Sequence, residues 1–515
     1  MIKGIRVARS ASVVGFFTFL SRILGLLRDM VFAHIFGSGF VADAFFVAFR
    51  IPNLLRKLFA EGSLTASFVP VFSDYLIQKG KDEAFKLANR VLSCLFLLLV
   101  FVTLLGIIFS PLIVKVSAYG FTSDPEKFNL TVVLTRIMFP YILLISIVAF
   151  FMGVLNAFGH FGAPAAAPIF LNIFMIISAI YLARMFNVPI IAVSIGVLLG
   201  GLAQVLLQVP FVKSFGFKFS FQPVFKDEGV KRIGLLALPT LFGAAVYQLN
   251  QVIGTLLASF LREGSVSWLY YADRLVQFPL GIFGVAMGTV SLASLSRHAA
   301  NKDWDTYNKT LGQAMGILSF TSVPATFGLI ILGEPIVQLF FERGKFTHYD
   351  TIMTNKALCA YAVGLLAYSQ IRVLASGFFA LKDTKTPVYV AILALVVNFV
   401  AGVILMKPFG HTGLALALSI ASLAQAAILY YLLEKKTKGN LTHALLKSMA
   451  KSIICSAVMA VIVYLGNSFL FVNVGGFTAL MTKVLALVLV GAFVYVILAY
   501  LFKVEEIRLF KISGG

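Results

Sequence analysis

Charged side chains are scarce in this sequence. Only 12% of its 515 residues are Asp, Glu, Lys or Arg, whereas an average soluble protein has roughly 25%. The polar stretches are short, and no segment has the composition of a separate soluble domain. This composition excludes an ordinary soluble globular chain.

Several sequence signatures of enzymes are missing as well. The chain has no paired-aspartate motif with which a membrane prenyl or sugar-phosphate transferase would hold Mg²⁺, and no P-loop for ATP. The three cysteines, Cys94, Cys359 and Cys455, lie far apart in apolar segments, which predicts buried free thiols rather than disulfides or a zinc site. The six histidines occur singly. We therefore expect no catalytic residues, no resident metal and no cofactor.

Long apolar runs are abundant instead. Hydrophobic residues make up 60% of the chain, and the mean hydropathy is +0.96. Runs of about 20 apolar residues are typical of membrane-spanning helices, so we predict an all-α polytopic membrane protein with about fourteen spans. The spans are expected at 10–36, 41–77, 87–116, 130–156, 164–184, 187–212, 232–261, 265–295, 309–333, 350–380, 387–406, 412–433, 444–466 and 476–502.

Two features refine this prediction at the N-terminal end. The first apolar run is longer than that of a signal peptide and carries arginines, so we interpret it as the first span. The second run is interrupted by Pro52 and Gly62, where we expect a bend.

The loops differ in basic charge according to which side of the membrane they face. Alternate loops and both termini carry about 25 Lys and Arg residues on one side against about 7 on the other, which is a strong positive-inside bias. The bias places both termini in the cytoplasm, as an even number of spans requires. The net charge of +21 is thus expected to set topology and attract the membrane surface, and we expect no nucleic-acid partner because the charge is dispersed.

A weak internal repeat suggests two homologous halves. The segment GSGFVADAFFVAFR at 37–50 is similar to REGSVSWLYYADR at 262–274, and each is followed by Pro and then Gly. We therefore expect a six-helix lobe at 1–220, a second at 221–436, and two additional helices at 437–515. Proteins built from such repeats bind their substrates between the two halves.

Charged residues nevertheless interrupt several spans. They are Arg22, Arg28 and Asp29 in the first, Asp43, Arg50, Arg56, Lys57 and Glu61 in the second, and Asp273 and Arg274 in the eighth. A charge in the middle of a bilayer costs roughly 2.5–3.5 kcal/mol, so such residues usually face a cavity or one another. Helical spacing puts Arg22 and Asp29 on one face with Gly25 between them, while Arg28 points to the side.

Two interpretations of these charges remain open at this point. Interhelical salt bridges and long side chains that reach the interface could explain single residues, particularly Lys57 and Glu61. The whole set contains more arginines than its aspartates can neutralise, which indicates an anionic ligand. Because the planar guanidinium donates two parallel hydrogen bonds, phosphate or diphosphate is the favoured group.

The motifs that carry these charges resemble those of a known family. SRILGLLRDMVFAHIFGSGFVADAFFVAFRIPNLLRKLFAEGSLTASFVPVFSDY, at 21–75, and GSVSWLYYADRLVQFPLGIFGVAMGTVSLASLSRH, at 264–298, are similar to signatures of the bacterial lipid II flippases (MurJ, also called MviN). FFALKDTKTPVYVA, at 378–391, resembles another. The resemblance covers the whole chain.

The resemblance implies two six-helix lobes around a central cavity, with the last two helices forming a groove for a lipid tail. It implies transport of lipid II, an undecaprenyl-diphosphate disaccharide pentapeptide, across the bacterial cytoplasmic membrane by alternating access, with membrane lipids as further partners and the chain acting as a monomer. With the charge analysis, it predicts that the substrate-binding residues are Arg22, Arg28, Asp29, Asp43, Arg50, Arg56, Glu61 and Arg274. Hinges are expected at Gly25, Pro52 and Pro279.

Alternatives remain within the same superfamily of exporters. A flippase for another polyprenyl-diphosphate-linked glycan would need the same arginines, whereas a drug or cation antiporter would need acids instead. Some family members bind sodium through acids on the seventh and eleventh spans, but here those spans offer only neutral candidates, Asn250 and Asn398. Neutral ligands hold a hard cation weakly, so we favour the membrane potential as the driving force and name no coupling ion.

Overall fold

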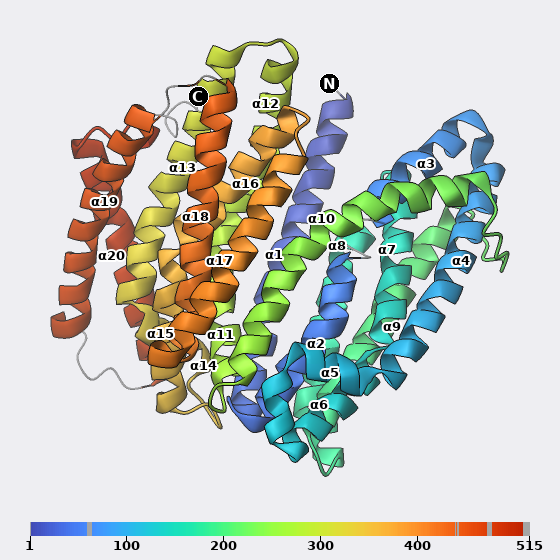
Figure 1. Ribbon diagram of the computed structural model, residues 1–515, viewed down its shortest axis with the longest axis horizontal. Coiled ribbons are helices and arrows are strands. Elements are labelled where there is room, and N and C mark those ends of the chain that lie inside the picture. Colours follow the sequence, from blue (N-terminus) through green and yellow to red (C-terminus); the bar gives the residue numbers. More distant parts are fainter. Residues whose placement is uncertain (1, 59–63, 438, 440–441, 471–475, 508–515) are drawn as a thin grey trace. The chain divides into compact units, whose positions relative to one another are not determined.

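The computed structural model describes residues 2–58, 64–437, 439, 442–470 and 476–507. All regular secondary structure in this part of the chain is helical (Figure 1). Helices satisfy every backbone hydrogen bond within one segment, which is what the interior of a bilayer requires. The predicted all-α membrane fold is thereby confirmed.

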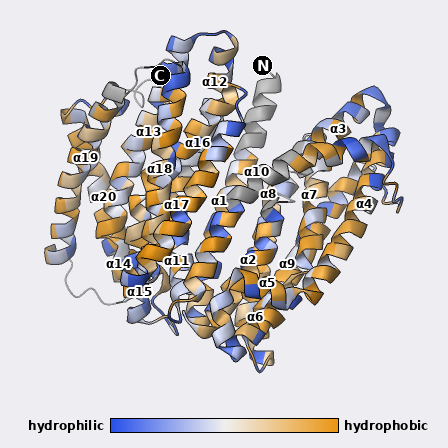
Figure 2. Ribbon diagram, viewed as in Figure 1, coloured by the Kyte–Doolittle hydropathy of each residue, from blue (hydrophilic) through white to orange (hydrophobic). Residues whose placement is uncertain are grey.

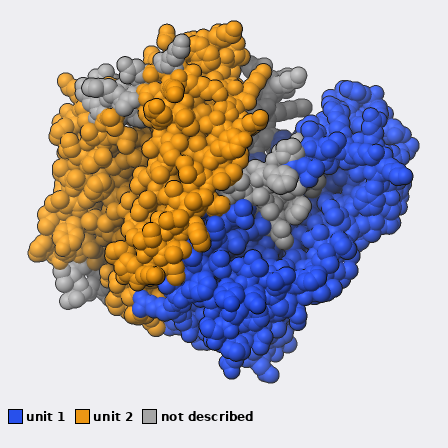
Figure 3. Space-filling view, in the orientation of Figure 1, with its two compact units in different colours: residues 1–266, 343–345 blue, residues 267–342, 346–515 orange. Residues whose placement is uncertain are grey.

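The chain divides into two compact units (Figure 3). Unit 1 comprises Met1–Val266 and Arg343–Lys345, and unit 2 comprises Ser267–Glu342 and Phe346–Gly515. The boundary after Val266 separates parts of the chain that pack mainly within themselves. The predicted lobe boundary near residue 220 is instead based on the internal sequence repeat. The proposed lobes therefore stay a prediction.

The helices of unit 1 include several that are separated by short breaks. They are α1 (Ile2–Phe36), α2 (Phe40–Leu58), α3 (Leu64–Gln78), α4 (Gly80–Ile108), α5 (Ser110–Ser117), α6 (Pro125–Met138), α7 (Tyr141–Ala157), α8 (Gly162–Ile180), α9 (Ile190–Ser214) and α10 (Glu228–Ser259). The predicted second span is thus two helices, α2 and α3, and α2 continues through Pro52. The break expected at Gly62 falls in residues 59–63, outside the described part.

Unit 2 contains the remaining helices, and α11 begins at its border. They are α11 (Ser265–Pro279), α12 (Val285–Ala300), α13 (Trp304–Ile331), α14 (Gly333–Phe341), α15 (His348–Val363), α16 (Leu365–Ala380), α17 (Lys385–Phe409), α18 (His411–Thr437), α19 (Thr442–Leu465) and α20 (Phe477–Leu501). A π-helical segment, Leu280–Gly284, separates α11 from α12. The predicted eighth span therefore changes its helical geometry directly after Pro279.

Many helices are long and apolar enough to cross a membrane. In the described residues nine pass this test, or up to ten if α15 and α16, bent by 41°, form one span. Figure 2 shows hydrophobic residues along the middles of helices such as α4 and α9 and hydrophilic residues where α3 meets α4. The exact count of fourteen spans stays a prediction.

Phenylalanine rings form much of the core of unit 1. Phe68 and Phe72 of α3 pack with Phe85 of α4 and Phe150 of α7, and all four are buried. The ring centroids of Phe68 and Phe150 are 4.9 Å apart. Phe217, which follows α9, also enters this core, 5.5 Å from Phe85. Aromatic contacts of this kind hold α3, α4 and α7 together and also fix the chain beyond α9.

Candidate functional site

Arg28 and Asp29 form a buried ion pair on α1. The guanidinium atoms Nε and Nη2 of Arg28 lie 3.0 and 2.6 Å from Oδ1 of Asp29, and the residues are only 7% and 3% exposed. Adjacent residues on a helix do not normally face one another, so the side chain of Arg28 must turn along the helix to reach its neighbour. The sequence analysis had Arg28 pointing to the side, away from Asp29.

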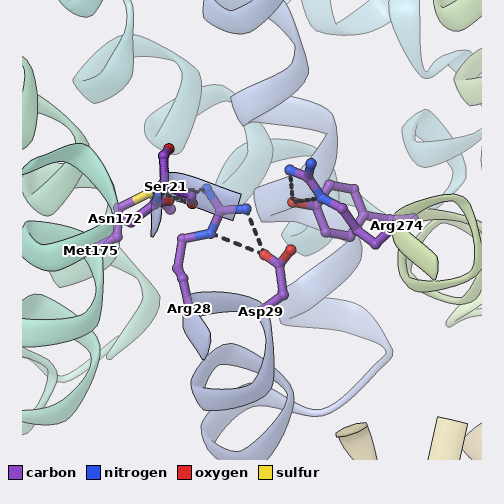
Figure 4. A network of polar contacts seen from close by, with 7 residues as sticks. Ser21, Arg28, Asp29, Asn172, Met175 and Arg274 are labelled. Carbon is purple, nitrogen blue, oxygen red and sulfur yellow. Dashed lines mark hydrogen bonds and ion pairs between the residues drawn. The ribbon is translucent and has the colours of Figure 1, made fainter. Parts of the chain in front are cut away.

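Asn172 of α8 completes this network (Figure 4). Its Oδ1 accepts a hydrogen bond of 3.2 Å from Nη1 of Arg28, and its Nδ2 donates one of 3.2 Å to the backbone oxygen of Ser21. Arg28 Nη1 also lies 3.9 Å from the sulfur of Met175. The amide therefore orients the guanidinium and joins α8 to α1 one turn before Gly25.

The sequence analysis did not identify Asn172 as a site residue. The signal was an amide in the otherwise apolar stretch IFLNIFMIISAI, where an unpaired polar group in lipid would be costly. Gly25 lies next to this amide, and a Cβ built there would make only an ordinary van der Waals contact, 3.8 Å from Nδ2 of Asn172. Arg22, one turn and a half before Arg28, is half-buried on the same helix.

Asp43 lies in a second buried ion pair of unit 1. Its Oδ2 accepts from Nζ of Lys127, on α6, at 2.9 Å, and from the backbone N–H of Gly264 at 2.8 Å. Asp43 and Lys127 are 1% and 6% exposed. Lys127 falls outside the predicted spans 87–116 and 130–156, yet its ammonium group is buried and lies 4.5 Å from the ring centroid of Phe121. Asp43 thus joins α2, α6 and the turn before α11.

The remaining predicted residues of α2 contact polar groups nearby. Nη1 of Arg50 donates to the backbone oxygen of Gln251, at 3.0 Å, and to the hydroxyl of Thr255, both on α10. Nε of Arg56 donates to Oδ1 of Asn53 at 2.9 Å, within the same helix. Glu61 lies outside the described residues. Neither arginine is brought to the Arg28–Asp29 pair by these contacts.

Arg274 belongs to unit 2 and contacts an aromatic residue on its own helix. Its Nε and Nη2 lie 3.2 and 2.8 Å from the hydroxyl of Tyr270, and its guanidinium carbon is 5.0 Å from that ring's centroid. The adjacent acid, Asp273, accepts a hydrogen bond from the amide of Gln277. These contacts hold the guanidinium at the hydroxyl and ring of Tyr270, and an arginine is positively charged in such a position.

These contacts change the charge balance expected from sequence. Asp29 neutralises an arginine, Arg28, but Asp43 pairs with a lysine. A buried ion pair of this kind can bind an anion by exchanging partners, because the planar guanidinium can donate to phosphate as well as to a carboxylate. The predicted substrate and hinge roles of all these residues stay predictions. The preference for no named coupling ion stays a prediction as well.

Comparison with known proteins identifies the family. The family model of the lipid II flippase MurJ matches residues 32–500. A probable lipid II flippase MurJ of Vibrio cholerae is 39% identical over 461 residues, which cover 88% of each chain. One from Haemophilus influenzae is 40% identical over 426 residues, covering 80% of this chain and 83% of the relative.

Solved structures agree with this assignment. A lipid II flippase MurJ in an inward closed conformation matches with a TM-score of 0.80 and 31% identity, covering 95% of this chain and 98% of that one. An inward-facing multidrug resistance MATE family transporter of the MOP superfamily matches with a TM-score of 0.69 and covers 85% of this chain and 99% of that one, but at 13% identity, which indicates a shared fold alone. The chain belongs to the lipid II flippase MurJ family.

Proposed function

We propose that this protein moves lipid II from the inner to the outer leaflet of the bacterial cytoplasmic membrane, for cell-wall synthesis. The observation that carries the proposal is the buried Arg28–Asp29–Asn172 network on membrane helices of a chain in this family. A guanidinium kept in the membrane by a carboxylate and an amide can donate to a diphosphate.

The transport step follows from the family's alternating conformations. The positively charged groups attract the diphosphate when the site is open to the cytoplasm, and the apolar tail stays in lipid. A change of conformation then exposes the head group on the other side. The membrane potential can return positive charge inward, since it supplies about 2.3 kcal/mol per charge per 100 mV. No covalent step is needed, so the protein acts as a transporter and not as an enzyme.

The proposal also includes two further features, namely that both termini lie in the cytoplasm and that the protein acts as a monomer. The positive-inside bias supports cytoplasmic termini, and the chain contains its own charged network, which supports a monomer. Labelling of single cysteines with a membrane-impermeant maleimide in intact cells tests the topology. Ser123→Cys, before α6, should react from outside, whereas Lys302→Cys, in the turn before α13, should react only after the membrane is permeabilised.

The decisive measurement is the exposure of lipid II on the outer leaflet. In intact cells that depend on this protein, an external probe that modifies exposed lipid II is applied to wild type, Arg28→Ala and Arg274→Ala at matched expression. We expect both variants to lose exposure and to accumulate lipid II inside, because each lacks a guanidinium for the diphosphate. Arg184→Ala, an exposed arginine beyond α8, is the matched control and should behave as wild type.

Two other results would contradict the proposal. Unchanged exposure in both variants would overturn the role of the arginines. Unchanged exposure after complete depletion of the protein would overturn lipid II as the substrate and favour another glycolipid.

A further inference from the structure

The segment between α9 and α10 has an unusual pattern of phenylalanines. Residues 215–227 read FGFKFSFQPVFKD, so Phe occurs at every second position from 215 to 221 and again at 225. A turn with Gly216 at φ +87° ends α9, and the chain then runs beside α4 without regular secondary structure (Figure 1).

Two polar residues of α4 hold this segment in place. Asn89 donates from Nδ2 to the backbone oxygen of Lys218 at 3.0 Å and accepts from the backbone N–H of Ser220 at 2.9 Å. The hydroxyl of Ser93, one turn further along α4, accepts from the backbone N–H of Gln222 at 2.8 Å. With Phe217 buried in the core, these bonds fix the backbone against the flank of α4.

The fixed segment presents its other phenylalanines outward. Phe219, Phe221 and Phe225 are 62%, 51% and 57% exposed. A loop surrounded by water would be expected to bury such rings or to lack them, and a contiguous exposed apolar patch indicates an interaction surface. Because the backbone is held by hydrogen bonds to α4, the rings cannot reach the core by a small shift of the loop.

Exposed lysines accompany these rings. Lys213, Lys218, Lys226 and Lys231 are all exposed. Of the two acids at 213–231, Asp227 is largely buried and is paired with Arg90, whose Nη1 lies 2.5 Å from its Oδ2. Glu228 is exposed. The surface is therefore apolar and positively charged at once, the combination that fits an anionic membrane surface.

The position of the segment along α4 agrees with this interpretation. Asn89 and Ser93 precede Phe96, Leu97 and Leu98, which are exposed on α4 at 38%, 38% and 50%. These residues belong to a helix that is apolar enough to span the membrane. The phenylalanines of the segment therefore continue a lipid-facing surface at the end where the polar, lysine-rich part of α4 begins.

We propose that residues 217–226 form an interfacial anchor, with the exposed phenylalanines inserted between lipids and the lysines bound to anionic headgroups of the cytoplasmic leaflet. The inference rests on the proposed orientation of the chain but not on transport of lipid II. The anchor ties the chain between α9 and α10 to the membrane surface, so that α10, capped by Asp227, begins from a fixed depth.

Collision of a spin label with two reagents measures this insertion. In a variant without native cysteines, Phe221→Cys is labelled and the protein is placed in phosphatidylcholine vesicles with or without phosphatidylglycerol. We expect the label to collide mainly with oxygen, which concentrates in lipid, and little with a water-soluble nickel chelate. Asp82→Cys, exposed in the first turn of α4, is the matched control and should show the opposite preference.

The lysines predict how the insertion depends on lipid charge. Phosphatidylglycerol should shift the label at residue 221 towards the inserted state. Loss of one lysine, in Lys213→Gln, Lys218→Gln or Lys226→Gln, should lower the equilibrium constant for this insertion roughly fivefold at low ionic strength. Lys115→Gln, an exposed lysine at the end of α5, should change nothing. Thermal unfolding of each variant confirms that it is folded.

Three results would overturn the anchor. They are a label at residue 221 as open to the nickel chelate as the label at residue 82, an insertion unaffected by phosphatidylglycerol, or protection that requires another protein instead of lipid. Arg28→Ala should leave the collision pattern unchanged even though it abolishes lipid II exposure. Failure of the anchor and failure of the proposed transport are therefore separate outcomes.

Discussion

At the residue scale, buried charges in this protein contact partners that helical spacing does not reveal. Asp43 meets Lys127, 84 residues away, and Arg28 meets Asn172, 144 residues away. A buried charge without such a partner would cost several kcal/mol. A residue can therefore be essential because it holds helices together and not because it touches the substrate. Substitutions of Asp43 can separate these two roles.

The pair formed by Asp43 and Lys127 permits that separation. We expect Asp43→Leu and Lys127→Met each to lower the free energy of unfolding by about 3–5 kcal/mol, because each leaves the other charge buried and unpaired. The double variant should be much closer to wild type. Thermal unfolding in detergent measures this, with the exposed Lys115→Met as control.

Lipid II exposure then assigns the role of Asp43. If the pair is structural, the double variant should restore exposure that the single variants lose. If the double variant is stable but inactive, Asp43 acts on the substrate, and the structural interpretation is wrong.

At the element scale, glycines allow helices to approach closely. A Cβ at Gly106 of α4 would lie 1.9 Å from the ring of Phe139, between α6 and α7. One at Gly413 of α18 would lie 2.1 Å from the backbone oxygen of Leu405, on α17. Small residues serve this purpose in membrane proteins, where helices associate through close packing.

Substitution of two glycines tests this packing. Gly106→Ala should destabilise the protein by about 1–3 kcal/mol, because the methyl group displaces the ring of Phe139. Gly254→Ala, in α10, is the matched control, since a Cβ there meets nothing within 4 Å. It should be neutral or should stabilise by up to about 1 kcal/mol through helix propensity. Equal unfolding temperatures for the two variants would contradict the proposed role of Gly106.

At the scale of the whole molecule, the net charge of +21 makes the acidic residues important for stability at low pH. Protonation of carboxylates removes attractive pairs and increases repulsion among the basic groups. Asp383, in the turn between α16 and α17, is a clear case. Although burial raises the pKa of this carboxyl group, hydrogen bonds from Lys436 of α18 and from Thr386 lower it to about 2, from an ordinary 3.8.

The shift of Asp383 predicts how stability depends on pH. Because the pKa is lower in the folded state, the pair with Lys436, 2.7 Å long, stabilises the fold above pH 4 and loses this effect as the pH falls towards 2. We expect Asp383→Asn to lower the unfolding temperature at pH 6 but not at pH 2. The exposed Asp305→Asn is the control. A constant difference between Asp383→Asn and wild type across this range would contradict the pair's contribution.

The sequence by itself determined the class of protein, the family and the first charged helix. Composition and apolar run length are sufficient for an all-α membrane fold, because the bilayer leaves few alternatives for the backbone. The cost of charge in lipid singled out Arg28 and Asp29, and the long motifs around them identified the family. These conclusions need only local sequence.

The tertiary structure alone decided the partners. Asn172 and Lys127 were missed as functional neighbours because each lies on a different helix from the charge that it meets, and helical periodicity gives no distance between helices. The phenylalanines at 219–225 fall between the predicted spans 187–212 and 232–261, and only the hydrogen bonds to Asn89 and Ser93 placed their segment along α4. Contacts between distant segments depend on how whole helices pack, and a local pattern does not contain that information.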